Sequence, residues 1–174
     1  MYGAKELAES FQTVRGNTIQ IAEDIPADKY DFRAAPLVKS VGEMLAHVAV
    51  APRWQIEVHS QHIPLIDFAF FGQRLARSAA EEQALRTKEQ IVAALEEGGE
   101  QFATFLAGLT PDDLDETVSF PPPIQPAQKS RFELLAGVKE HEMHHRGQLM
   151  LIERILGIVP HLTRRREAMR AARA

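Results

Sequence analysis

Two histidines near the C-terminal end of the chain, His141 and His145, have the spacing of a metal-binding pair. They are four residues apart, so on an α-helix they project from the same side, one turn apart. Two imidazoles in that arrangement can bind a single metal ion. A third ligand must come from elsewhere, and the candidate is His47, in another amphipathic segment. The pattern therefore predicts a metal site.

All three histidines fall on apolar stripes of their predicted helices. The residues in phase with them are Met44, Val50 and Trp54 beside His47, and Leu134, Val138 and Ile152 beside the pair. Such stripes face the protein interior, where polar side chains are costly unless something satisfies them. Three inward histidines from two helices can meet at one point, as in metal sites of helix bundles. A single inward histidine is more often a hydrogen-bonded core residue, and for His47 taken alone that alternative is favoured.

The type of ligand bears on the role of the site. Three neutral imidazoles leave the charge of a divalent ion uncompensated, and an open fourth position makes such an ion a strong Lewis acid. Structural zinc sites are usually closed by four protein ligands, often thiolates, and this chain has no cysteine. The ligand set therefore favours a reactive or ligand-binding site over a structural one.

Other polar side chains near the histidines have open interpretations. His144 could replace His145, support the site or face solvent, and Gln148 could orient a ligand or a bound water. Glu43, one turn before His47, could accept its second ring proton or serve only as a helix cap. The remaining histidines are interpreted as ordinary surface residues: His59, His62 and His161.

Residues 141–145 also match the H-E-x-x-H pattern of zinc metalloproteases, in which the glutamate, here Glu142, is the general base. A longer form of that pattern requires glycine and histidine where this chain has Gln148 and Leu151. No edge strand that could hold a peptide substrate is predicted either. The protease interpretation is therefore a minor alternative.

Composition limits the classes of function. A chain of 174 residues fits a single domain, residues 1–174, and its formal net charge of -4 gives no general attraction to nucleic acid or anionic membranes. The basic tail from Arg164 to Arg173 carries no interleaved aromatic residues. Met1 to Glu9 lacks the apolar core of a signal peptide, and no apolar run approaches the length of a membrane span. We expect a soluble cytoplasmic protein without nucleic-acid or membrane partners, and any thiol in its chemistry must be external.

Four amphipathic segments must position these residues. The spacing of apolar residues predicts helices over about Lys5–Ile25, Ser40–His62, Thr87–Leu109 and Ser130–Leu156. Ser40 with Glu43, and Thr87 with Gln90, form capping boxes, and Pro52 predicts a bend or early end near Val48. The sequence predicts an all-α four-helix bundle with a short C-terminal helical tail.

The connections between these segments are long. Leu65 to Arg86 is expected to be a connection whose apolar first half packs over the open end of the bundle or lines a cavity. Thr110 to Asp113 closes the third helix and can start one extra turn, and Phe120 to Pro126 is expected to be stiff and extended. No segment shows the sustained alternation of a strand.

Nearly the whole chain resembles the DinB-like (YfiT-like) metalloenzyme superfamily. The resemblance rests on three motifs in order: Ile25-Pro26-Ala27-Asp28-Lys29-Tyr30-Asp31-Phe32-Arg33, Ser40-Val41-Gly42-Glu43-Met44-Leu45-Ala46-His47 and His141-Glu142-Met143-His144-His145-Arg146-Gly147-Gln148. It implies a four-helix bundle in up-down-down-up order, a divalent metal, zinc or nickel in most members, and His47, His141 and His145 as the ligands. It also implies a frequent homodimer and, for some relatives, transferase or isomerase activity with low-molecular-weight thiols.

The leading hypothesis is a metal-dependent transferase that binds an external thiol and presents its thiolate to a small electrophilic substrate. A metal-dependent hydrolase that uses metal-bound water is the first alternative. A bundle that binds metal for stability, sensing or partner binding, without catalysis, is the second. The resemblance predicts the site more directly than it predicts the substrate.

Overall fold

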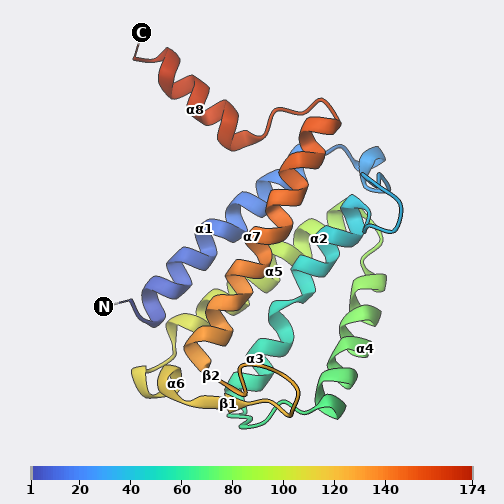
Figure 1. The fold of residues 1–174 in the computed structure, drawn as a ribbon. Helices are drawn as coiled ribbons and strands as arrows, with labels where there is room; N and C mark the ends of the chain where they lie inside the picture. Colours follow the sequence, from blue (N-terminus) through green and yellow to red (C-terminus); the bar gives the residue numbers. More distant parts are fainter. Residues whose placement is uncertain (1, 174) are drawn as a thin grey trace.

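Four long helical segments pack side by side in the computed structural model, which describes residues 2–173 (Figure 1). They are α1 (Ala4–Asp24), the consecutive pair α2 (Val41–Val50) and α3 (Pro52–Ser60), α5 (Lys88–Ala107) and α7 (Arg131–Ile155). In Figure 1, α1 and α7 run in one direction, and α2–α3 and α5 run in the other. The all-α fold class is confirmed.

The helix boundaries follow from the capping residues. The side chain of Ser40 accepts a hydrogen bond from the backbone N–H of Glu43, and Thr87 and Ser130 cap α5 and α7 in the same way. The expected break at Pro52 is present, because α2 ends at Val50 and α3 begins at the proline. The expected extra turn after α5 is α6 (Pro111–Asp115).

A buried ion pair joins all four helical segments at the centre of the core. The Arg15 guanidinium on α1 donates to both carboxylate oxygens of Glu142 on α7, with the closest contact at 2.8 Å. It also donates to the backbone oxygens of Leu95 on α5 and Val48 on α2. Gly99 makes room for this arginine, since a Cβ atom there would lie 2.7 Å from the Cγ atom of Arg15. The glycine in the middle of α5 is thus a close-packing position.

The expected connection from Leu65 to Arg86 is wrong, because most of it forms a fifth long helix, α4 (Phe68–Ala84). Asp67 caps it by accepting a hydrogen bond from the backbone N–H of Phe70. None of its residues is buried, and it packs along α2 at the side of the bundle (Figure 1). The segment between α2–α3 and α5 therefore returns along the bundle as a helix rather than covering its end. The expected alternative that its apolar first half lines a cavity is confirmed, because Phe71 is part of a pocket lining.

Two short strands are also present where none is predicted. β1 (Thr117–Ser119) and β2 (Gln128–Ser130) pair antiparallel around the proline-rich segment, with Val118 opposite Lys129. Three residues are too few to produce a detectable alternation. The remaining elements are a 3₁₀ turn, η1 (Ala27–Lys29), and the tail helix α8 (His161–Ala171), which has no buried residue. None of the helices within residues 2–173 is both long and apolar enough to cross a membrane.

Candidate metal centre

The three predicted histidines meet at one point between α2 and α7. The Nε2 atom of His141 lies 3.0 Å from the Nε2 atom of His47 and 3.1 Å from the Nε2 atom of His145. All three nitrogens lie within 4.8 Å of one another, and each residue is partly buried. The sequence placed the pair on one face of a helix, and the packing of α2 against α7 brings the third residue to it.

The hydrogen-bond partners of the Nδ1 atoms determine which ring nitrogens of His47 and His145 carry protons. The Nδ1 atom of His47 lies 2.7 Å from Oε1 of Glu82, a carboxylate that can only accept, so this ring carries its proton on Nδ1. The Nδ1 atom of His145 lies 2.8 Å from the side-chain oxygen of Gln148 and donates to it in the same way. In the neutral rings, the Nε2 atoms of His47 and His145 are then both lone-pair acceptors.

The three Nε2 atoms have too few N–H donors to form both contacts as hydrogen bonds. Both acceptor nitrogens face His141, whose Nε2 atom can carry at most one proton. At least one of the two contacts therefore brings two nitrogen lone pairs to about 3 Å, which is unfavourable unless a cation lies between them. Zinc–nitrogen bonds of about 2.0–2.1 Å place tetrahedrally arranged ligand nitrogens about 3.3–3.4 Å apart, close to the observed spacing. The donor set thus fits a divalent metal.

The surroundings of His141 and His145 favour the neutral form of their rings. Burial, together with the neighbouring histidines His145, His47 and His144, lowers the pKa of His141 to about 4. Burial also lowers the pKa of His145, although its hydrogen bond to Gln148 opposes the shift. Neutral imidazole is the form that binds metal, so near pH 7 protons compete little for these nitrogens.

Glu82 accepts the hydrogen bond from the second ring nitrogen of His47, a role that the sequence suggested for Glu43. Glu43 instead binds Arg33 through both carboxylate oxygens and caps α2, so of its two alternatives the helix cap is confirmed and the contact with His47 is wrong. Glu82 comes from α4 and also accepts a 3.0 Å hydrogen bond from Lys39. Burial opposes its ionisation, but the hydrogen bonds from His47 and Lys39 hold the pKa of Glu82 below its ordinary value. A charged carboxylate behind a ligating histidine fixes the ring and raises its basicity.

The protease interpretation is wrong on structural grounds. Glu142 would have to be an accessible general base, but it is 1% exposed and bound to Arg15 in the core. Both of its carboxylate oxygens are directed to the guanidinium of Arg15 on α1. A carboxylate in that position is a partner of a core arginine and cannot reach a substrate at the candidate metal centre.

The other histidines have varied environments. His62 is exposed as expected, but His59 is only 2% exposed, so its assignment to the surface is wrong. His161 is half-buried against Asn17, and His144 is exposed with Nε2 3.3 Å from the amide of Gln148. The misassigned His59 lies at the end of a helix in the sequence, where the packing of α7 covers it.

A second cluster of metal-ligand types consists of His62, Asp113 and Glu116. Its carboxylates already have partners, since Asp113 caps α6 and Glu116 pairs with the guanidinium of Arg131. The ring of His62 lies between them, with Nδ1 3.0 Å from Glu116. This cluster is accounted for as an ion-pair network at the helix ends.

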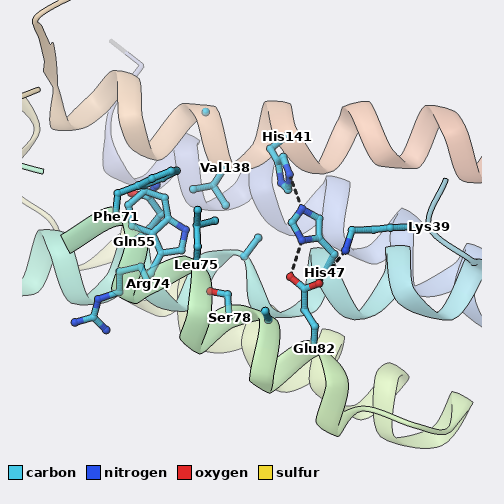
Figure 2. A pocket seen from close by; sticks show the side chains of 14 residues that line it. Lys39, His47, Gln55, Phe71, Arg74, Leu75, Ser78, Glu82, Val138 and His141 are labelled. Carbon is cyan, nitrogen blue, oxygen red and sulfur yellow. Dashed lines mark hydrogen bonds and ion pairs between the residues drawn. The ribbon is translucent and has the colours of Figure 1, made fainter. Parts of the chain in front are cut away.

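A pocket of about 500 Å³ opens beside the histidines, between α4 and the helices α2, α3 and α7. We call it the α4 pocket; its lining consists of Lys39, His47, Ala51, Trp54, Gln55, Phe71, Arg74, Leu75, Ser78, Ala79, Glu82, Gly137, Val138 and His141. Figure 2 shows His47, His141, Lys39 and Glu82 at one end and Gln55, Phe71 and Arg74 at the other. The α4 pocket is mostly apolar, and the candidate metal centre lies at one end of it.

Comparison with known proteins agrees with the observed fold. A family model described as the DinB superfamily matches residues 10–149, a range that contains all three histidines. Among solved structures, a DinB-like protein from Bacillus subtilis, YjoA, is similar, with 21% sequence identity and a TM-score of 0.66 over 87% of this chain and 92% of that one. At this identity the likeness shows the fold. A search of curated proteins found no match.

Proposed function

This chain belongs to the DinB superfamily, and we propose that it is a metal-dependent transferase that joins an external low-molecular-weight thiol to a small electrophilic substrate. In this proposal His47, His141 and His145 hold one divalent ion, zinc or nickel. The observation that carries it is the convergence of three Nε2 atoms with too few protons to satisfy one another. The Nδ1 atoms of His47 and His145 are held by Glu82 and Gln148, respectively.

The chemistry follows from this ligand set. When bound, an ion held by three neutral imidazoles has an open position and acts as a Lewis acid, which favours the thiolate form of a thiol near neutral pH. The chain contains no cysteine that could occupy that position itself. In the transfer, the thiol gives its proton to solvent, and its sulfur forms a bond to the electrophilic carbon as the leaving group departs. The α4 pocket would hold the electrophile and exclude water from it.

The chain's own residues orient the centre. Glu82 fixes the ring of His47 and balances part of the charge of a bound ion, and Lys39 in turn holds Glu82. Gln148 fixes the ring of His145.

Cobalt substitution tests the thiol. We expect protein loaded with Co²⁺ at pH 7 to develop a sulfur-to-cobalt charge-transfer band in the near ultraviolet when 2-mercaptoethanol is added, but not when ethylene glycol is added. His145→Ala should abolish the band, and His144→Ala, at the adjacent exposed histidine, should retain it. A metal-loaded protein without any such band would contradict the transferase and leave metal-assisted hydrolysis, which uses the same ligands with water.

A further inference from the structure

A buried chain of hydrogen bonds leads from the surface to the end of the α4 pocket far from the histidines. Glu116 accepts a 2.7 Å hydrogen bond from Nε of Arg131, whose side chain is 3% exposed. Nη1 of Arg131 lies 3.1 Å from Nδ1 of His59, and Nε2 of His59 lies 3.0 Å from Oε1 of Gln55. Gln55 itself is 7% exposed and lines the pocket.

The chemistry of this chain permits one arrangement of protons. A guanidinium only donates, so Nδ1 of His59 must accept from Arg131, and the proton of the neutral ring lies on Nε2. Burial, reinforced by the charge of Arg131, lowers the pKa of His59 to about 4, so the ring is neutral near pH 7. His59 therefore donates to Gln55, which fixes the carbonyl oxygen of that amide toward the histidine. The amide nitrogen of Gln55 must then face away from it.

The amide nitrogen of Gln55 carries two N–H donors. Within residues 2–173 it makes no hydrogen bond to the protein, although the residue as a whole is only 7% exposed. The nitrogen is not among the fully enclosed polar atoms, so it reaches the open space of the pocket, where a ligand can accept a hydrogen bond from it. The amide oxygen cannot take this position, because it is held by His59.

The charges around the pocket indicate the type of acceptor. Arg74 is neutralised by Glu57 and lies over the ring of Phe70, and Lys39 at the other end is paired with Glu82. An anion at Gln55 would have to draw Arg74 away from Glu57 to be balanced. A neutral carbonyl oxygen meets the donor without that cost.

We infer that Gln55 is a specificity-determining residue that selects ligands with a neutral carbonyl oxygen. The ligand would be an apolar molecule whose carbonyl group lies at Gln55 and whose other end reaches the histidines. His47, Ala51 and Gln55 follow one another at successive turns, so the two ends are roughly 12 Å apart. Leu75 and Val138 lie between them (Figure 2), and Trp54 is another apolar residue of the pocket lining. The inference rests on the proposed function only where it places the other end of the ligand at the histidines, because the carbonyl site at Gln55 is argued independently of the metal.

The test uses metal-free protein, so that its result does not depend on the metal centre. The probes are 4-phenylbutan-2-one and 2-methyl-4-phenylbut-1-ene, in which a methylene group replaces the carbonyl oxygen. Binding is measured by the fluorescence of Trp54, which is the single tryptophan of the chain and lines the pocket. The measured quantity is the ratio of the two affinities, ketone over alkene.

We expect this ratio to fall about three- to tenfold in Gln55→Leu, since one hydrogen bond to the ketone is lost. Gln55→Glu, which keeps the volume but replaces the donor, should lower it as well. Ser78→Ala, at a polar residue in the middle of the same pocket, should leave it unchanged. An unaltered ratio in both Gln55 variants, or no binding of either probe to the wild type, would overturn the inference. Failure of the metal centre would leave these values intact and would be seen in the cobalt experiment.

Discussion

Glu142→Leu is expected to lower the free energy of unfolding by about 3–5 kcal/mol, because it leaves the charge of Arg15 buried without a partner. The two side chains are 4% and 2% exposed and are joined by three contacts of 2.8 to 3.1 Å. Loss of one partner does not release the other to water, since Arg15 is held between α1, α2, α5 and α7. Urea unfolding monitored by circular dichroism measures the effect.

The double variant separates the ion pair from the packing around it. Arg15→Met with Glu142→Leu removes both charges and replaces them by apolar side chains of similar length, so we expect it to be more stable than either single variant. Stabilities that simply add would contradict a coupled buried pair. If Glu142 were instead the general base of a protease, Glu142→Leu would leave a stable, inactive protein.

Glu153→Gln is expected to remove a loss of stability that the wild type undergoes between about pH 4.5 and pH 7. Glu153 is 0% exposed, and neither carboxylate oxygen has a hydrogen-bond partner within the described residues. Burial, with a smaller contribution from the charge of Asp24, raises its pKa to about 7, although Arg164 and Arg154 oppose the shift. The group is thus neutral in the folded protein at mildly acidic pH.

The sign of the effect follows from proton binding. A carboxyl group whose pKa is higher in the folded than in the unfolded protein holds more protons when folded, so the free energy of unfolding falls as the pH rises through this range. Its stabilising contribution is complete below about pH 4.5 and is lost above about pH 7. We expect the difference in stability between wild type and Glu153→Gln to change by about 3 kcal/mol across this range.

The measurement is a series of urea titrations from pH 4.5 to pH 8. Glu140→Gln, an exposed replacement of the same type on α7, is the matched control and should follow the wild type. The buried histidines titrate in this range too, and their neutral folded forms lose stability toward acid, but they are common to all three proteins and cancel in the differences. Parallel curves for wild type and Glu153→Gln would show that the carboxyl group is not perturbed.

The sequence predicted the bundle helices because their signals are local. Ser40, Thr87 and Ser130 cap helices by contacts within three residues, and Pro52 breaks one by its own ring. The helix α4 was missed although Phe71, Leu75 and Ala79, which line the pocket, recur every four residues along it. Its cap at Asp67 and its run of alanine, arginine, glutamine and glutamate were the available signals.

Part of the histidine cluster was also predictable from local signals. The spacing of His141 and His145 on one helix places them together whatever the rest of the chain does. Glu82 is 35 residues from the histidine it contacts, and only the return of α4 along α2 brings the two together. The contact between Arg131 and His59 likewise joins α7 to α3 and has no local signal. Partners of this kind depend on tertiary packing.

The metal content of untagged protein tests the central claim that His47, His141 and His145 hold one divalent ion. We predict about one zinc or nickel ion per chain by elemental mass spectrometry, in the protein as purified or after incubation with the metal. His141→Ala should contain none, and His144→Ala should contain as much as the wild type. A wild-type protein that holds no metal and takes none up would contradict the account, and so would a His141→Ala variant that retains it.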